Sequence, residues 1–324
     1  MPVTTTVVGS YPKPPDEGQQ FAVRKALHAI ERGEATSEDL LGAQDELARA
    51  VIGEQEDAGI DIVTDGLVRW DDIVTPFARK MSGFEIGGLL RFFDNNVYYR
   101  RPICTGPIVW GGPATIEALE FAQKVARRPV KAVIPGPITF ARLSVDEHYG
   151  DYERYVMAIA VVLSQEAFEL YSAGARVIQV DEPSLLQAPE DIELAGRALS
   201  IVTKDLGDTE VVLAGYFADA KRLGAGLFGL PVTRFGLDLV SGPENFELIK
   251  GAPPEARIQA GIVDARNTKL EPVDDLVHTI ESLVETVGAD RLWVSPSAGL
   301  EFLPREKARA KLRRLCEAVE EVSE

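Results

Sequence analysis

Two adjacent carboxylates stand where an apolar, strand-like run ends. The stretch "ARVIQVDEPSLL", residues 175–186, places Asp181 and Glu182 directly before Pro183. Successive residues of a strand point to opposite sides, so only one of the two acids can face inward. We interpret that acid as binding a substrate cation, with the other acid as its supporting partner, and take both as candidate catalytic residues. Capping the next helix or pairing with an arginine is the structural alternative.

A tyrosine and a serine-containing turn follow two further runs of the same kind. Tyr216 lies at the end of "EVVLAGYF" and is a candidate acid or base. The segment "VGSYPKP" combines Gly9, which allows a close approach of the backbone, with Ser10, whose hydroxyl and neighbouring amides could hold a carboxylate. A plain turn is the alternative for this segment.

Two more loops contain groups suited to an anionic ligand. "TDGLVRWDD", residues 64–72, carries Arg69, whose guanidinium can pair with a ligand carboxylate or with Asp71 or Asp72. "SPSAG", residues 295–299, offers the Ser297 hydroxyl as part of a phosphate or carboxylate loop. A surface salt-bridge cluster and a simple turn are the respective alternatives. The substrate-binding candidates are therefore Gly9, Ser10, Arg69, Asp72, Asp181 and Ser297.

Histidines and cysteines are few and scattered along the chain. Their positions are His28, His148, His278, Cys104 and Cys316, and no spacing among them resembles a zinc site. His148, in the loop "DEHYGDY", is the one histidine that could reach the mouth of a barrel. No metal ligand is predicted.

The elements that must position these residues are β-rich runs alternating with helical patterns, which indicate βα units and a parallel sheet. The runs cover residues 4–11, 60–66, 130–136, 176–183, 210–217, 234–241, 257–265 and 291–299. Nearly all are continuous apolar runs, so a closed (β/α)8 barrel is favoured over an open sheet of eight strands. Active sites of such barrels lie at the carboxyl ends of the strands, where the candidates above fall.

One segment breaks the βα alternation. Residues 83–112 carry "DNN" between aromatic and β-branched runs and predict a β-hairpin excursion that covers one end of the barrel. No linker or low-complexity tract interrupts residues 1–324, so we expect a single barrel domain.

Composition restricts the partners. The 324 residues include 51 acidic and 34 basic side chains, a net charge of -17, which repels nucleic acid and anionic membranes. No apolar run approaches the roughly 20 residues that span a bilayer, and no signal peptide is visible. Two cysteines are too few for a disulfide scaffold. We expect a cytoplasmic protein whose partner is a small molecule.

Several of these segments, taken in order, resemble the cobalamin-independent methionine synthase family, in the single-barrel form that matches the C-terminal half of that enzyme. They are "TTTVVGSYPKP", "GPITFARLS", "IQVDEPSL", "GIVDARN" and "LWVSPSAGL". The resemblance implies a (β/α)8 barrel that transfers a methyl group to the thiol of homocysteine. It also implies a zinc ion, which binds the substrate sulfur as a thiolate, because a coordinating metal removes the thiol proton. By the same match Ser10 and Asp181 hold the amino-acid part of the substrate.

The zinc site of the family is where this sequence departs from it. The resemblance places a His-Xaa-Cys motif at the end of the fifth strand, where this chain has Leu213 and Gly215, and a second cysteine at the position of Ala298. Glu244 lies near the position of the zinc-binding glutamate, with a spacing that differs by one or two residues. Leu67 stands where a substrate-binding glutamate is expected. No cofactor is therefore predicted, although zinc is expected for the family.

Three functions remain open at this stage. The first is a methionine-synthase-like methyltransferase that activates its nucleophile with Tyr216 or an acid. Because Arg142 and Leu143 occupy the region of the folate-stacking tryptophan of the family, we expect a corrinoid protein or another methyl donor rather than folate. The second is a metal-free lyase or decarboxylase on the same barrel, with Asp181, Glu182, Arg69 and Tyr216 as the acid–base set. The third is a non-catalytic protein that binds a methionine-like ligand.

Overall fold

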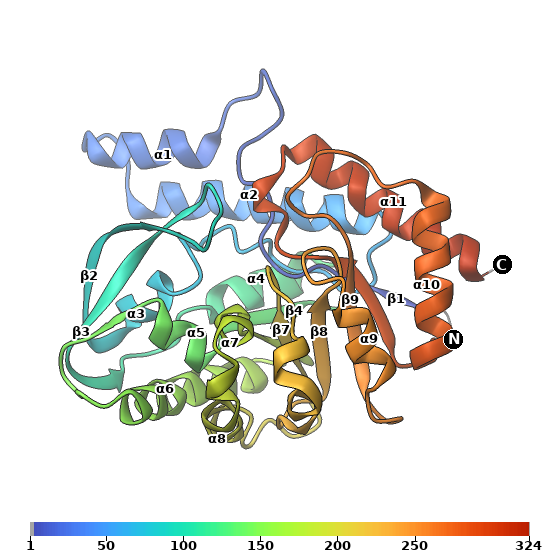
Figure 1. Ribbon diagram of the computed structural model, residues 1–324. Coiled ribbons are helices and arrows are strands. Elements are labelled where there is room, and N and C mark those ends of the chain that lie inside the picture. The colour runs from blue at the N-terminus through green and yellow to red at the C-terminus, as the bar shows by residue number, and fades with distance from the viewer. Residues whose placement is uncertain (1–2, 324) are drawn as a thin grey trace.

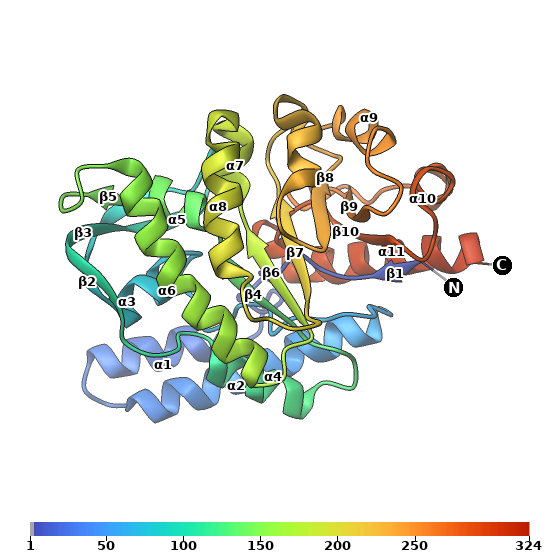
Figure 2. The same ribbon diagram turned by 90° about the horizontal axis from the view of Figure 1, so that it is seen from below.

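A curled parallel sheet organises the protein, and helices pack along it (Figures 1 and 2). The computed structural model describes residues 3–323. The sheet has seven strands in the order β1-β10-β9-β8-β7-β6-β4, and every pairing in it is parallel. Its strands are β1 (Thr4–Thr5), β4 (Lys131–Pro135), β6 (Val177–Asp181), β7 (Glu210–Gly215), β8 (Arg234–Asp238), β9 (Arg257–Val263) and β10 (Leu292–Pro296).

The longer helices follow the strands in the βα order that the sequence predicts. The α-helices are α1 (Ala22–Glu31), α2 (Ser37–Asp57), α3 (Thr75–Lys80), α4 (Ile116–Val125), α5 (Pro137–Arg142), α6 (Tyr152–Ser172), α7 (Pro183–Gln187), α8 (Ile192–Val202), α9 (Asn245–Lys250), α10 (Val273–Val287) and α11 (Arg305–Ser323). Short 3-10 helices cover Pro189–Asp191, Lys221–Gly229 and Leu300–Phe302. No helix of residues 3–323 combines the length and the apolar character that crossing a bilayer requires.

The predicted eight-stranded barrel is not confirmed, because residues 60–66 form no regular strand. They contribute two isolated parallel bridges, Thr6 to Ile62 and Val63 to Val130. Side-chain atoms accept some of the hydrogen bonds that a regular strand pair would make between backbone groups. The Thr5 amide donates to Asp61 Oδ2 at 2.9 Å, and the Asp61 amide donates to Thr5 Oγ1 at 3.0 Å. Strand β1 is two residues long, and the Thr6 amide continues its pairing by donating to the Val294 carbonyl at 2.9 Å.

The predicted hairpin is confirmed. Strands β2 (Met81–Arg91) and β3 (Tyr98–Trp110) pair antiparallel, and β5 (Val145–Asp146) adds a third strand to this separate sheet. The hairpin extends beside the main sheet in both views (Figures 1 and 2). Phe92 and Phe93, just after β2, pack on Phe217, just after β7, with ring centroids 6.1 and 5.5 Å apart. The turn of the hairpin therefore lies over the carboxyl end of the sheet.

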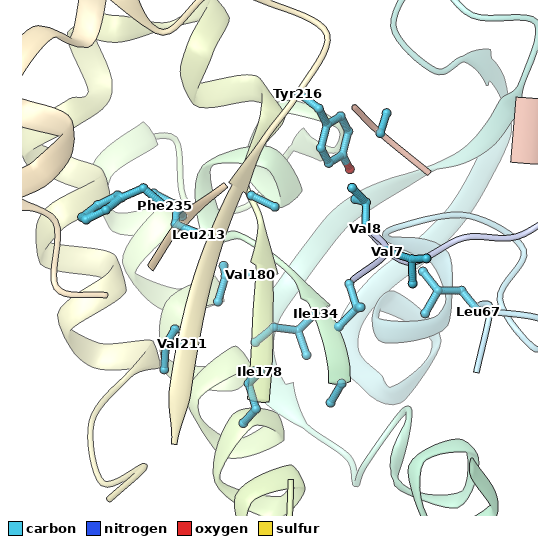
Figure 3. Packing of buried hydrophobic residues seen from close by; sticks show 14 of the residues in the cluster. Val7, Val8, Leu67, Ile134, Ile178, Val180, Val211, Leu213, Tyr216 and Phe235 are labelled. Atoms are coloured by element: carbon cyan, nitrogen blue, oxygen red, sulfur yellow. The ribbon is translucent and has the colours of Figure 1, made fainter. Parts of the chain in front are cut away.

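The core sits between the sheet and its helices. All residues of β4, β6, β8 and β10 are buried, as parallel strands covered on both faces require. Figure 3 shows Ile134, Ile178 and Val180 packed along β4 and β6, with Tyr216 at the upper end of the same region. This core holds the carboxyl ends of the strands, and the side chains that follow them, in fixed relative positions.

Candidate active site

A cavity of about 230 Å³ opens at the carboxyl end of the sheet. Its walls come from the ends of β6 and β7, the loop after β1, residues 67–73 and the hairpin turn. Its polar lining residues are Ser10, Lys13, Asp71, Asp72, Asp181, Tyr216 and Glu301. Its apolar lining residues, which form what we call the apolar wall, are Pro14, Leu67, Trp70, Ile73, Phe92 and Val97. Such a mixture of an apolar wall and a few convergent polar groups is typical of small-molecule sites.

Asp181 is the last residue of β6 and is 4% exposed. Its Oδ1 accepts a hydrogen bond from Gln179 Nε2 at 2.6 Å, and its Oδ2 accepts one from the Tyr216 hydroxyl at 3.1 Å. Burial raises the pKa of this carboxyl to about 7, although both hydrogen bonds and the Lys131 ammonium act in the opposite direction. Near neutral pH the group can therefore bind a cation or take up a proton.

Tyr216 is placed as a hydrogen-bond donor. Burial, followed by the adjacent Asp181 charge, raises the pKa of its phenol well above the ordinary value. The ring points away from Leu213 and towards the chain segment that carries Val8 (Figure 3). Because the phenol keeps its proton, we interpret Tyr216 as orienting Asp181 rather than as acting as a base.

Glu182 does not line the cavity, and its role is structural, although it caps the earlier helix α5 and not the helix that follows it, α7. Its carboxylate accepts hydrogen bonds from the backbone amides of Ile138, at 3.2 Å, and Thr139, at the start of α5. Burial raises the pKa of Glu182 to about 7, and the amide donors oppose this change. The acid of the pair that faces the cavity is Asp181, as the strand alternation requires.

Two of the other substrate-binding candidates reach the cavity. Both Ser10 and Asp72 contribute polar groups to its lining. Asp72 is already engaged by backbone donors: its Oδ1 accepts from the amides of Val74 and Thr75 at 2.9 and 2.7 Å. This bonding holds the start of α3, so Asp72 has a structural task besides any contact with a ligand.

Three candidates are placed elsewhere. Arg69 pairs with Asp45 at 2.5 Å, on the outer side of the segment that lines the cavity. Gly9 does not line the cavity and lies behind Leu67, because a Cβ at this position would stand 3.2 Å from Leu67 Cδ1. Ser297 is buried, accepts a hydrogen bond from the Ala265 amide at 3.2 Å, and lines a separate void of about 10 Å³ behind Tyr216.

Two charged residues of the cavity were missed by the sequence reasoning. The Lys13 ammonium donates to the Trp70 carbonyl, and burial lowers its pKa. Glu301 Oε2 is buried without a hydrogen-bond partner among the described residues, and burial raises the pKa of this carboxyl to about 7. Gly299 makes room for it, because a Cβ there would lie 2.1 Å from Glu301 Oε2. Lys13 lies within the quoted segment "VGSYPKP", and Glu301 follows "SPSAG" by two positions, so considering every charged residue in and just after these loops would have found them.

The residues at the positions of the family's zinc ligands do not fit a metal. Leu213 is buried beside Phe235, its register partner on β8 (Figure 3). A Cβ at Gly215 would meet Leu186 at 3.1 Å, and Ala298 is fully buried. None of the three side chains has a lone pair to donate, and residues 3–323 contain no group of three or more His, Cys, Asp or Glu arranged around a metal position.

Cys104 and His148 do not replace the missing ligands. Cys104 is buried in β3, where its thiol donates to the Gly106 carbonyl at 3.3 Å. His148 is exposed and packs edge-on against Tyr149, so it does not reach the cavity as the sequence allowed.

Comparisons with known proteins give the same picture of the chain. A family model described as "Cobalamin-independent synthase, Catalytic domain" matches residues 3–196 and 240–321. The unmatched residues 197–239 include β7, the strand whose end carries Leu213 and Gly215. The match therefore breaks at the strand where the resemblance places the first zinc ligands.

Similar sequences and structures extend over nearly the whole chain. The methionine synthase of Sulfolobus acidocaldarius is 32% identical over 310 residues, 95% of this chain and 88% of that protein. The methionine synthase of Saccharolobus solfataricus is 30% identical over 322 residues, 99% of this chain and 95% of that protein. A B12-independent methionine synthase from a Shewanella species, solved with selenomethionine, has the same fold, with a TM-score of 0.85 at 23% identity over 100% of this chain and 98% of that one. On the family match and the sequence relatives together, the chain belongs to the cobalamin-independent methionine synthase family and is an enzyme of the methyltransferase class.

Proposed function

We propose that this enzyme transfers a methyl group to the thiol of a homocysteine-type amino acid bound in the cavity at Asp181. The observation that carries the proposal is the cavity itself, in which Asp181 and Glu301 face an apolar wall in a member of a methionine synthase family. A small amino acid with a sulfur-containing side chain has the charges and the apolar part that these walls complement.

The charges of the cavity suggest how the ligand is oriented. The ligand ammonium binds Asp181, whose carboxylate is held by Gln179 and Tyr216. The ligand carboxylate binds Lys13 and Ser10, on the loop after β1. The side chain with the thiol then extends along Trp70 and Leu67.

Without a metal, the thiol needs another proton acceptor. Glu301 suits this task because burial brings its pKa to about 7, close to the working pH of a general base. In the proposed step the thiol proton moves to the Glu301 carboxylate, and the sulfur forms its bond to the methyl carbon. The bond between the methyl group and the donor breaks, and its electron pair stays with the donor.

We infer that the donor is a corrinoid protein and not a folate. Arg142 and Leu143 supply no aromatic face in the region where the family stacks a folate. Arg142 is instead tied to Asp191 at 2.8 Å, and Leu143 is buried.

The proposal also includes the architecture around the cavity, a barrel in which β1 and β4 are joined. We infer that the bridges at Ile62 and Val63 join β1 to β4 and complete a (β/α)8 barrel, and that residues 3–323 form one domain. Closure brings the Ser10 loop next to the ends of β4 and β6, which is where the amino-acid ligand would need it.

The same residues keep a second candidate open, namely metal-free decarboxylation or another lyase reaction of a small amino acid. It is favoured by the apolar side chains at the zinc positions and by two buried carboxyls, Asp181 and Glu301, whose pKa values lie near 7. Such a reaction would need a carboxylate binding site and a proton donor, both of which the cavity offers.

The experiment that tests the proposal is a product assay with mass spectrometry. The enzyme is incubated with homocysteine and either methylcobalamin, as a corrinoid donor, or methyltetrahydrofolate. We expect methionine with methylcobalamin only and at least a hundredfold less with Asp181→Asn, whereas the exposed Glu247→Gln acts as wild type. Carbon dioxide released from the amino acid would instead support the lyase, and binding without any product would support a non-catalytic relative.

A further inference from the structure

The core below the cavity contains a lysine whose charge has no carboxylate partner. Lys131 begins β4 and is 1% exposed. Its ammonium donates to the Val7 carbonyl at 2.5 Å and to Gln179 Oε1 at 2.6 Å, and among residues 3–323 no carboxylate oxygen lies within ion-pair distance. An isolated buried ammonium costs several kcal/mol, so a lysine at this position needs a reason other than packing.

Gln179 connects this lysine to the cavity. Its Oε1 accepts from Lys131, so its Nε2 is left to donate, to the Val8 carbonyl at 2.6 Å and to Asp181 Oδ1 at 2.6 Å. The ammonium thereby fixes which end of the Gln179 amide faces Asp181. If the amide turned over, its oxygen would stand against the carboxylate, and both the hydrogen bond and the attraction would be lost.

We propose that Lys131 is a positioning residue for Asp181: acting through Gln179, it orients the carboxylate and keeps it ionised to receive the cationic group of a ligand. The ligand part of this inference rests on the proposed function, whereas the coupling of Lys131 to Asp181 does not. Burial lowers the pKa of Lys131 to about 7 and raises that of Asp181 to about 7, and the charge of each group acts against the effect of burial on the other.

Other charged groups near Lys131 and Asp181 also affect the pKa values of these two residues. Arg234 on β8 opposes the charge of Lys131, and Asp65 lines a small void together with this lysine. Around Asp181 stand the Tyr216 phenol and the carboxyls of Glu182 and Glu301, whose own pKa values the Asp181 charge raises. These groups stay in place in the variants below, so a change in the titration of Asp181 reports on the removed charge.

The test follows the Asp181 carboxyl in ligand-free protein by carbon-13 NMR, with Asp181→Asn to identify its signal. In Lys131→Met we expect the titration midpoint to rise by about one pH unit, since one unit corresponds to a tenfold change in the protonation equilibrium. Lys311→Met is the matched control, because Lys311 is equally buried but pairs with Glu271 at 2.8 Å on another part of the molecule. This control is expected to lower stability and to leave the Asp181 midpoint unchanged.

A second variant covers the case in which Lys131→Met does not fold. Lys131→Gln removes the same charge but keeps an N–H donor for the Val7 and Gln179 oxygens, so it should also raise the midpoint. A folded variant of either kind with the wild-type midpoint would overturn the inference. Methionine binding, followed by Trp70 fluorescence at pH 7, should weaken about fivefold in Lys131→Met, because the ionised fraction of Asp181 falls, and should recover towards pH 8.5. Failure of wild type to bind methionine would count against the proposed function, while the NMR result would still decide the role of Lys131.

Discussion

Two buried carboxyls of the cavity, those of Asp181 and Glu301, lower the stability of the fold and can also take up or release a proton near neutral pH. Asp181 and Glu301 have pKa values of about 7 because burial disfavours their charged forms. Each folded-state pKa lies above that of the unfolded chain, so the folded state holds the proton more tightly. Both groups therefore penalise folding increasingly as the pH rises from about 4 to about 7, and a bound cation would relieve that penalty.

Glu301→Gln should expose this cost directly. The variant removes a charge whose Oε2 has no hydrogen-bond partner among the described residues. We expect its free energy of unfolding to exceed that of wild type by about 1 kcal/mol above pH 7, and the difference to vanish below about pH 4. Urea unfolding at several pH values measures both, and an exposed control, Glu306→Gln, should show no such pH dependence. A variant that is less stable than wild type at pH 8 would show that the Glu301 carboxylate is stabilised in the folded state.

At the scale of the element, three helices begin on carboxylates, of which those of Glu182 and Glu166 are buried and that of Asp72 is partly buried. Glu182 binds the first amides of α5, Asp72 those of α3, and Glu166 accepts from the Ala114 and Thr115 amides just before α4. These acids stabilise helices that would be marginal alone. The sequence offered helix capping as the structural alternative for one acid of the Asp181–Glu182 pair, but it did not indicate that Glu182 would cap the earlier helix α5.

Gly136→Ala tests the contact between Glu182 and α5. The backbone at Gly136 has φ -79°, which alanine adopts freely, but the added Cβ would lie 2.0 Å from Glu182 Oε2. We expect Glu182 to be displaced and the protein to lose about 2 kcal/mol of stability, measured by urea unfolding. Gly42→Ala is the control: it lies in α2 with no atom within 4 Å of the new Cβ, so it should be neutral or stabilising by up to about 1 kcal/mol. Equal stability of Gly136→Ala and wild type would mean that the capping contact contributes little.

In the whole molecule, the hairpin of β2 and β3 completes the cavity that the sheet begins. Phe92 lies just after β2, lines the cavity, and is 7% exposed. It packs on Phe217, which holds a left-handed φ of 71° just after β7, so the hairpin and the sheet are fixed against each other at the mouth. The apolar wall therefore depends on a segment outside the βα repeat.

Phe92→Ala should open this wall. We expect the affinity for methionine to fall about tenfold, mainly through faster dissociation, because the ligand loses apolar contact and gains access to water. Stopped-flow fluorescence of Trp70 measures the rates. Leu89→Ala on the same hairpin removes a side chain that is 60% exposed and should leave binding unchanged. Identical dissociation rates for Phe92→Ala and wild type would show that the hairpin does not retain the ligand.

Much of this architecture is predictable from local pattern alone. The apolar runs locate all seven strands of the sheet, and "DNN" locates the hairpin. The sequence pattern does not predict where a strand ends when side chains make part of its hydrogen bonds, as they do between Thr5 and Asp61. Nor does it show that Arg69 turns outward to Asp45, or that Glu301 folds over Gly299 into the cavity, because both depend on contacts between distant segments.

Titration calorimetry with methionine, on wild type and on Asp181→Asn, tests the account most directly. In wild type we expect binding that strengthens as the pH rises from about 6 to about 8, as the Asp181 carboxyl loses its proton and can pair with the ligand ammonium. In Asp181→Asn the affinity should fall by about ten- to a hundredfold, and this rise with pH should disappear. Wild-type affinity in the asparagine variant, with an unchanged dependence on pH, would contradict the assignment of the cavity.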